Sequence, residues 1–256
     1  MSAQGARTEL PTIAILCGGL ATRLHPVTLT VPKSMLQVAG EPFIAHQLRL
    51  LVKAGFRDVV LLCGYLGGQI QSFVQDGSQF GCTVRFSFDG PDLLGTGGAV
   101  RRALPLLGRD FMLTYGDSYC PTNYARIYNA FRDSTMPGLM TIFHNENRWD
   151  TSNVEYCDQK IVRYDKTSRD ARMKYIDYGV SAFKADVFEG FEGDQAFELS
   201  SIQKNLVELG QLAGLEVFER FYEIGKIDGL EEADIELRER RGVTGAQNLL
   251  NEEPSH

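Results

Sequence analysis

A glycine pair directly after an apolar stretch constrains this chain more than any other feature of its sequence. Residues 11–16 read Pro-Thr-Ile-Ala-Ile-Leu, which is typical of a buried β-strand, and the glycines Gly18 and Gly19 follow almost at once. Adjacent glycines let the backbone turn sharply and approach a ligand, and the N–H groups of such a loop can point together at phosphate oxygens. Two cations and a proline come next: Arg23, Pro32 and Lys33. The pattern indicates a loop that binds a nucleoside triphosphate.

Two common phosphate-binding loops are excluded by spacing. A P-loop requires Gly-x4-Gly-Lys-Ser/Thr, and a dinucleotide fingerprint requires Gly-x-Gly-x-x-Gly; residues 18–22 read Gly-Gly-Leu-Ala-Thr and match neither. The competing interpretation is a tight strand-to-helix turn whose Arg23 and Lys33 merely face solvent. Thr22-Arg23-Leu24, Pro26 and Pro32-Lys33 all stand in register after the glycines, which favours the phosphate-binding interpretation.

Residues 16–33 resemble the signature of the sugar-1-phosphate nucleotidyltransferases, Gly-Gly-x-Gly-Thr-Arg-Leu followed by Pro and then by Pro-Lys-Pro. Ala21 stands where the family usually has glycine, and Ser34 stands where it usually has proline. The order of expected elements extends the resemblance to about residues 11–240. Within the family, Leu94-Gly-Thr-Gly-Gly-Ala and Phe221-Tyr-Glu-Ile-Gly look closest to heptose 1-phosphate guanylyltransferases and related hexose-1-phosphate enzymes.

Alternating strand and helix patterns predict an α/β fold, a mostly parallel sheet flanked by helices. The resemblance implies the Rossmann-like nucleotide-diphospho-sugar transferase fold. We expect one domain over residues 1–246, with a catalytic half at about 11–137, a strand-rich sugar-binding half at about 138–240, and a disordered tail at 247–256. The predicted helices are 41–54, 67–76, 97–107, 199–208 and 228–240. The predicted strands are 11–16, 58–64, 82–88, 110–115, 139–144, 153–156, 161–164, 176–183 and 215–222.

The composition narrows the partners. A net charge of −7 over 256 residues argues against a general nucleic-acid surface, so the important cations should be local. We expect no membrane span, because the sequence has no long apolar run, and the N-terminus lacks the apolar core of a signal peptide. The five cysteines are scattered singly and form no Cys-x-x-Cys pair. This usage is typical of a reducing compartment, so a cytoplasmic protein is expected, as a monomer or a homo-oligomer.

Two acidic residues are candidate metal ligands. Asp117 follows an apolar strand in Tyr-Gly-Asp-Ser, at the kind of position where open α/β sheets place ligands, and Glu223 follows a second apolar run. Magnesium needs only one or two carboxylates when phosphate oxygens and water complete its shell. Either acid taken alone reads as a turn residue. Together they resemble the family's paired metal carboxylates, with Glu223 where aspartate is common, and they imply Mg²⁺, with Mn²⁺ as an alternative.

The resemblance assigns the remaining contacts to two substrates. Nucleotide-binding residues would be Leu16, Gly18, Gly19, Thr96, Gly97 and Gly98. Sugar-phosphate binding residues would be Asn153, Asp165, Lys166 and Gly179, where Asp165 replaces the usual Glu and Thr167 the usual Pro. Taken individually, these polar residues read as strand-edge groups, and the Gly97–Gly98 stretch reads as a flexible helix start. Trp149 stays unassigned, because nothing in the sequence distinguishes a lid from an interface.

The implied reaction is nucleotidyl transfer from an NTP to a sugar 1-phosphate, with release of pyrophosphate. Arg23 would hold the pyrophosphate, Lys33 the α-phosphoryl group and Lys166 the attacking phosphate, so catalysis rests on positioning and charge neutralisation. The preferred substrates are GTP and a heptose or hexose 1-phosphate; a uridylyl- or cytidylyltransferase acting on an amino sugar or another sugar 1-phosphate is the alternative. A non-catalytic sensor would be expected to lose Arg23, Lys33 or Asp117, and a sugar oxidoreductase needs the missing dinucleotide loop.

Overall fold

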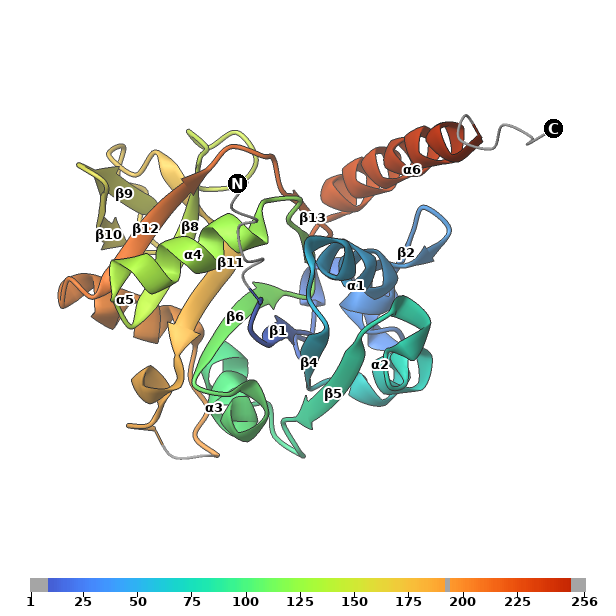
Figure 1. The fold of residues 1–256 in the computed structure, drawn as a ribbon, viewed down its shortest axis with the longest axis horizontal. Coiled ribbons are helices and arrows are strands. Elements are labelled where there is room, and N and C mark those ends of the chain that lie inside the picture. The colour runs from blue at the N-terminus through green and yellow to red at the C-terminus, as the bar shows by residue number, and fades with distance from the viewer. Residues whose placement is uncertain (1–8, 192–193, 250–256) are drawn as a thin grey trace, which may run out of the picture.

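A single nine-stranded sheet runs through the molecule in the order β5-β4-β1-β6-β11-β8-β12-β10-β9 (Figure 1). The computed structural model describes residues 9–191 and 194–249. The strands of this sheet are β1 (Ile13–Leu16), β4 (Asp58–Cys63), β5 (Thr83–Phe88), β6 (Asp110–Tyr115), β8 (Gly138–His144), β9 (Val154–Cys157), β10 (Lys160–Tyr164), β11 (Tyr175–Lys184) and β12 (Leu212–Val217). Two short ladders lie outside it: β2 (Gln37–Val38) with β3 (Glu41–Pro42), and β7 (Ser118–Tyr119) with β13 (Tyr222–Glu223).

The helices cover both faces of the sheet. They are α1 (Phe43–Ala54), α2 (Gly67–Val74), α3 (Gly95–Leu107), α4 (Tyr124–Ser134), α5 (Leu199–Glu208) and α6 (Ile227–Leu249). Successive side chains of a strand point to opposite faces, so Ile13 and Ile15 of β1 pack with α1, α2 and α4, while Ala14 packs with α3 and α5. Burial on both faces explains why β1 and β4 are almost entirely apolar. No helix in the described ranges has the length and apolar character that a bilayer crossing requires.

The predicted parallel sheet is confirmed for the first half of the chain, where β1 pairs in parallel with β4 and β6 and β4 pairs in parallel with β5. The second half is mixed, because β11 runs antiparallel to both β6 and β8 while β12 runs parallel to β8. Parallel strands place their carboxyl ends on one edge. The loops after β1, β5 and β6 therefore converge on one region of the molecule.

The larger differences from the sequence prediction are one helix, one strand and the end of the last helix. Helix α4 was not predicted; it begins after Asn123, whose side chain accepts the N–H of Arg126 at 3.0 Å and so caps the helix. Strand β12 covers 212–217 rather than 215–222, because Leu212–Val217 pairs with β8 while only Tyr222–Glu223 forms the separate ladder with β7. Helix α6 continues to Leu249, so 247–249 are helical rather than part of the expected tail, and 250–256 lie outside the described residues.

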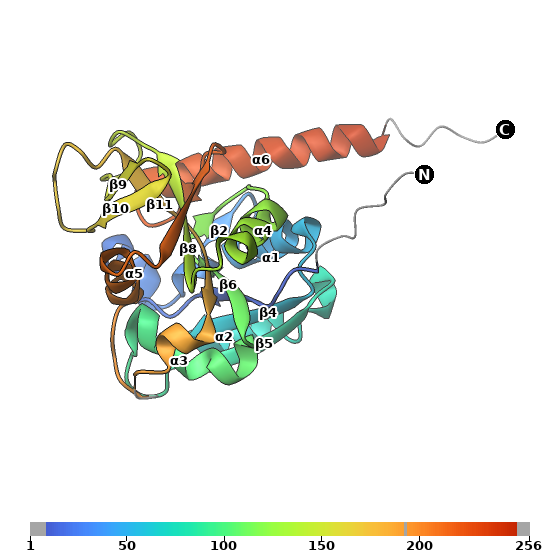
Figure 2. The same ribbon diagram turned by 60° about the vertical axis from the view of Figure 1, so that its left-hand side comes forward.

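Helix α6 crosses the molecule beside the β7–β13 ladder and projects past the body (Figure 2). Its first turn lies directly against β13: a Cβ on Gly229 would come within 2.2 Å of the Glu223 carbonyl oxygen. Farther along, Asp234 accepts the N–H of Ala39 at 2.6 Å. The start of α6 therefore supports the strand that carries Glu223, whereas a Cβ on Gly242 would meet nothing within 4 Å.

Gly229→Ala and Gly242→Ala make a matched pair on this helix. At Gly229 the new methyl group has to displace backbone, so we expect a loss of about 1–3 kcal/mol in the free energy of unfolding. At Gly242 the same change meets open space and should be neutral or add up to about 1 kcal/mol through helix propensity. Urea denaturation of both variants measures the difference. Equal stability of the two would show that α6 does not rest on β13.

Candidate active site

Two cavities meet at the carboxyl ends of the central strands. The first, of about 610 Å³, is lined by residues following β1, β5 and β6, among them Gly18, Gly19 and Asp89. The second, of about 690 Å³, lies toward the second half of the chain and includes Lys166. Both are lined by Tyr115 and Asp117, so the two spaces adjoin there. We call them the nucleotide cavity and the acceptor cavity.

The glycine loop forms one wall of the nucleotide cavity, together with Leu16. A Cβ on Gly64 would lie 2.8 Å from the Gly18 carbonyl oxygen, so this position requires glycine, and a Cβ on Gly18 would crowd the Gly64 backbone nitrogen at 3.1 Å. Gly19 has nothing within 4 Å of a would-be Cβ and leaves the wall open to a ligand. Ala21 adopts a left-handed conformation with φ 51°, which is where the family signature has glycine. The Thr28 hydroxyl donates to the Ala21 carbonyl at 2.9 Å and helps hold that conformation.

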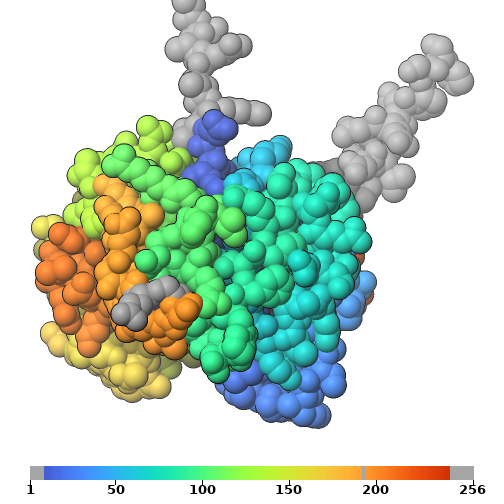
Figure 3. Space-filling model, turned by 90° about the horizontal axis from the view of Figure 1, so that it is seen from below, coloured from blue at the N-terminus to red at the C-terminus, as the bar shows by residue number. Residues whose placement is uncertain are grey.

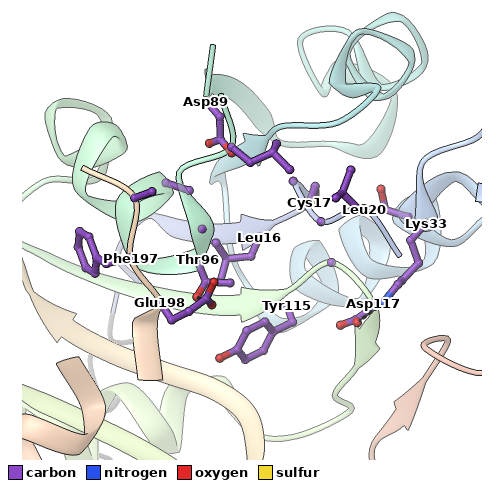
Figure 4. A pocket seen from close by; sticks show the side chains of 18 residues that line it. Leu16, Cys17, Leu20, Lys33, Asp89, Thr96, Tyr115, Asp117, Phe197 and Glu198 are labelled. Carbon is purple, nitrogen blue, oxygen red and sulfur yellow. Dashed lines mark hydrogen bonds and ion pairs between the residues drawn. The ribbon is translucent and has the colours of Figure 1, made fainter. Parts of the chain in front are cut away.

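Lys33 and Asp117 form the ion pair at the junction of the cavities. The Lys33 ammonium lies 2.8 Å from Asp117 Oδ2, and both side chains are only partly exposed, at 20% and 31% (Figure 4). Ser118 Oγ donates to Asp117 Oδ1 at 3.1 Å, which fixes the other oxygen. The pair places one cation and one carboxylate where a phosphoryl group and its metal would both have to be held.

Glu223 reaches the same point through backbone pairing. It stands opposite Ser118 in the β13–β7 ladder, and the N–H of Ile224 donates to the Asp117 carbonyl at 2.9 Å. The Glu223 side chain lines the acceptor cavity and remains in contact with solvent. Partial desolvation by the surrounding protein, and then the charges of Asp117 and Asp150, raise the pKa of Glu223 to about 7. The site thus concentrates negative charge that a cation would offset.

No group of three or more His, Cys, Asp or Glu side chains suited to a metal occurs in the described part of the chain. The two carboxylates Asp117 and Glu223 nevertheless fit Mg²⁺, since this ion commonly takes one or two protein carboxylates and fills its shell with phosphate oxygens and water. The charges of Asp117 and Asp150 contribute to the raised pKa of Glu223, and a divalent cation would offset this repulsion. Zinc fits poorly, since it prefers closed sets of nitrogen and sulfur ligands.

The opposite wall of the nucleotide cavity differs from expectation. Thr96 and Glu198 line it, with the Thr96 hydroxyl donating to Glu198 at 2.7 Å and accepting the N–H of Leu199 at 2.8 Å. Gly97 and Gly98 do not line it, because their N–H groups donate to the carbonyl of Phe197 at 2.9 and 3.2 Å. A Cβ on Gly97 would lie 2.3 Å from the Phe197 ring.

The absence of side chains at Gly97 and Gly98 therefore lets residues 195–198 pack against α3, and the amide groups of these glycines bond to that segment rather than to a ligand. In Figure 3 the orange segment that contains these residues lies against the green segment of α3, so the second half of the chain completes this wall.

Asp89 is a buried carboxylate on the nucleotide cavity. It follows β5, is 5% exposed, and accepts the N–H of Leu94 at 3.3 Å through Oδ2. Burial raises its pKa, although the Leu94 bond and the charge of Arg102 oppose the effect. Figure 4 shows Asp89 away from Lys33 and Asp117, so it faces the part of the cavity remote from the ion pair.

In the acceptor cavity, Lys166 lies over the Tyr115 ring, with Nζ 5.4 Å from the ring centroid. Asp165 does not line either cavity, because its Oδ1 accepts the N–H and hydroxyl of Thr167 and the N–H of Ser168 at 2.9, 2.7 and 3.2 Å. Its carboxylate builds the turn that carries Lys166 and is not presented to a ligand. Asp165 is therefore revised from a substrate contact to a positioning residue.

Asn153 and Gly179 both line the acceptor cavity. The Asn153 side-chain oxygen accepts the N–H of Asp177 at 2.9 Å, which ties β9 to β11 and leaves the amide nitrogen for the cavity. Gly179 has φ +97° at a point where the register of β11 against β8 shifts, and its N–H donates to Asp177 at 3.1 Å. Glycine is needed here because the left-handed region is costly for other residues.

Arg23, which the sequence placed with the nucleotide phosphates, lines the acceptor cavity rather than the nucleotide cavity. It sits on the 3₁₀ turn Thr22–Leu24. Burial alone would raise the pKa of Asp150, but the hydrogen bonds from Thr151 and Lys226, and then the charges of Lys226 and Arg23, lower it. Arg23 and Lys33 therefore line different cavities.

Sequence reasoning did not find several residues that line the cavities. Asp89 and Glu198 carry no motif, and the acceptor-cavity residues Arg148, Trp149, Arg169 and Arg220 lie in loops where no spacing rule applies. The one usable signal was Trp149, the single tryptophan of the chain. The Arg220 guanidinium carbon Cζ lies 3.4 Å from the centre of the Trp149 ring, and this cation–π contact joins two loops that are distant in the sequence.

Known proteins match this architecture over most of its length. The Nucleotidyl transferase family profile matches residues 13–240. An N-acetylmuramate α-1-phosphate uridylyltransferase of Neisseria meningitidis serogroup B is 26% identical over 224 residues, covering 86% of this chain and 95% of that protein. A D-glycero-α-D-manno-heptose 1-phosphate guanylyltransferase of Campylobacter jejuni is 26% identical over 196 residues, covering 76% of this chain and 86% of that one.

Among solved structures, HddC from Yersinia pseudotuberculosis complexed with GMP-PN superposes with a TM-score of 0.72 at 22% identity, over 89% of this chain and 100% of that chain, and shares the fold. The expected resemblance is confirmed by the profile match, and the chain belongs to the Nucleotidyl transferase family.

Proposed function

We propose that this protein transfers a nucleotidyl group from GTP to a heptose or hexose 1-phosphate, giving a nucleotide sugar and pyrophosphate. The observation that carries the proposal is the meeting of two cavities at Asp117, where Lys33 and Glu223 converge. A nucleotidyl transfer needs two anionic substrates whose phosphates meet at one shielded point. The sugar-1-phosphate nucleotidyltransferase relatives support the reaction class, but they use several bases and sugars.

The charges divide the work between the substrates. An oxygen of the sugar 1-phosphate attacks the α-phosphorus in line, and pyrophosphate leaves. Lys33 neutralises the α-phosphoryl group, Lys166 steers the attacking phosphate from the acceptor side, and Arg23 neutralises phosphate charge from across the junction. A phosphate monoester is already ionised at neutral pH, so no general base is needed. Positioning and electrostatic stabilisation supply most of the rate enhancement.

Asp117 and Glu223 would hold Mg²⁺, which would supply positive charge to offset that of the phosphates. The β7–β13 ladder holds Glu223 beside Asp117, while Ser118 occupies one Asp117 oxygen and Lys33 approaches the other. Lys33 then moves only from a carboxylate to an adjacent phosphate when the substrates enter.

The choice of GTP is supported by the carboxylates of the nucleotide cavity. An ionised carboxylate accepts hydrogen bonds and donates none. Guanine presents two adjacent N–H donors on N1 and N2, whereas uracil and thymine present a single N–H between two carbonyl oxygens, which a carboxylate repels. Asp89 has its Oδ2 on Leu94, and no other described group bonds its Oδ1. We therefore assign Asp89 to the guanine N–H groups.

Turnover can be tested by measuring pyrophosphate release over the four common NTPs and a panel of sugar 1-phosphates, with Lys33→Met beside the wild type. Loss of one charged phosphate contact should cost on the order of 2–4 kcal/mol in the transition state, or about thirty-fold to a thousand-fold in kcat. Lys53→Met, an exposed change outside both cavities, is the control. Wild-type kcat in Lys33→Met would contradict the assigned role.

Metal dependence is the next expectation. EDTA should abolish pyrophosphate release, and Mg²⁺ or Mn²⁺ should restore it, because without a cation the two carboxylates repel the anionic substrates. Asp117→Asn and Glu223→Gln should each raise the Mg²⁺ concentration needed for half-maximal rate, while Asp133→Asn on the exposed face of α4 should not. Full activity in chelator would show that the carboxylates serve another purpose.

Base selection is tested by Asp89→Asn. The amide keeps the shape and the acceptor for Leu94, but it loses the charge and gains a donor. We expect the ratio of kcat/KM for GTP to that for UTP to fall by about tenfold to a hundredfold. Asp92→Asn, an exposed change three residues along that does not line the cavity, should leave the ratio unchanged. A wild-type enzyme that prefers UTP would overturn the choice of GTP and leave the phosphate roles intact.

A further inference from the structure

Two arginines at the outer end of the acceptor cavity have no task in the proposed reaction. Arg148 and Arg169 come from different loops and both line this cavity. In the proposed reaction the anomeric phosphate of the acceptor has to reach the Asp117 junction, where the two cavities adjoin, and Lys166 lines the acceptor cavity. The body of the sugar then extends away from the junction into the cavity. Arg148 and Arg169 therefore face the sugar substituents rather than the reacting phosphate.

The loop that carries Arg148 is built to hold its shape. Asn145 is fully buried, donates to the Asp150 carbonyl at 2.7 Å and to Ser152 Oγ at 3.0 Å, and accepts the N–H of Trp149 at 3.3 Å. Ser152 is also buried, and its N–H donates to the side chain of Asn147 at 2.8 Å. These bonds cross the loop from both sides. Arg148 and Trp149 are thus presented from a preorganised loop.

Most carboxylates near the Arg148 and Arg169 end of the acceptor cavity already have a hydrogen-bonding or ion-pair partner. Those with a cation partner are Asp150 with Lys226, Glu232 with Arg220, and Asp170 with Arg163 and Arg172. Asp228 lies in the first turn of α6, where the helix dipole favours it, and Asp177 accepts from Tyr164 and Gly179.

The two arginines contrast with these pairs. Among the residues that the structure describes, Arg148 forms an ion pair with Glu146 alone, with 3.4 Å between Nη2 and Oε2. Arg169 donates to the carbonyls of Thr167 and Ser168 and to no carboxylate within the described ranges. Cationic hydrogen-bonding capacity is therefore left over at this end of the cavity.

The space also continues outward. A further cavity of about 560 Å³ shares Trp149, Asp150 and Arg169 with the acceptor cavity. Trp149 is 42% exposed, and one ring face is covered by Arg220, which itself pairs with Glu232. The aromatic ring and the two arginines thus border room for a substituent larger than a hydroxyl group.

We propose that the acceptor sugar carries a second anionic group, remote from its anomeric phosphate, which Arg148 and Arg169 bind. This rests on the proposed function, because it deepens the substrate class of the same acceptor cavity. A carboxylate and a phosphate share the required chemistry, since both accept charge-assisted hydrogen bonds from guanidinium groups. A neutral sugar would leave both arginines unused, so the acidic acceptor is selected by contacts that do not change during the reaction.

Three acceptors test the proposal: glucose 1-phosphate, glucuronic acid 1-phosphate for a carboxylate, and glucose 1,6-bisphosphate for a phosphate. We expect kcat/KM for at least one acidic acceptor to exceed that for glucose 1-phosphate by about tenfold, with the excess shrinking as salt is added. Arg148→Gln and Arg169→Gln should each reduce the preference by about threefold to tenfold, mainly through KM, and change glucose 1-phosphate turnover by less than about twofold. Arg126→Gln, exposed on α4 and outside the cavity, is the matched control.

Trp149 gives a second readout that does not need turnover, because it is the only tryptophan of the chain. Titration with an acidic acceptor should change its emission saturably, at lower concentration than glucose 1-phosphate does, and Arg169→Gln should weaken that response while preserving the stack on Arg220. Equal or better use of glucose 1-phosphate at low salt, or a preference unchanged in both variants, overturns the proposal. If no acceptor is turned over, the proposed function fails, and the Trp149 titration still decides whether the cavity selects a second anion.

Discussion

The Lys33–Asp117 ion pair is the contact on which the rest of the site depends. Its two members come from opposite ends of the catalytic half, and their 2.8 Å contact closes the glycine loop over the end of β6. An ion pair of partly exposed groups adds little stability by itself. Its value lies in position, because it stores a cation and a carboxylate at the point where two anionic substrates have to meet. Both cavities take their shape from that point.

Glu223, the second proposed metal ligand, is held in place by a short β-ladder. Two residues of β13 pair with two residues of β7, and the start of α6 packs against the same strand. Glu223 therefore depends on backbone bonds between segments far apart in the sequence rather than on side-chain contacts of its own.

The sequence predicted the parts of the molecule that obey local rules. The apolar run of β1, the glycines after it and the helical spacing of α1 are periodic or compositional signals, and the structure has all three. Asp89, Trp149 and Arg169 could not be found this way, because loops bring them to the cavities through contacts far apart in sequence. Asp165 shows the reverse case: its motif position suggested a ligand, but an aspartate two residues before Thr167 satisfies local backbone donors first.

The packing of α3 on residues 195–198 has a consequence for how the chain can be divided. Without side chains at Gly97 and Gly98, a segment from the second half of the sequence fits against the helix of the first half and supplies Glu198 to the nucleotide cavity. The two halves are thus joined at the nucleotide cavity itself. A first-half fragment excised at residue 137 would retain the phosphate loop but lose one wall of that cavity, so exchanging second halves between relatives would alter nucleotide recognition as well as the choice of sugar.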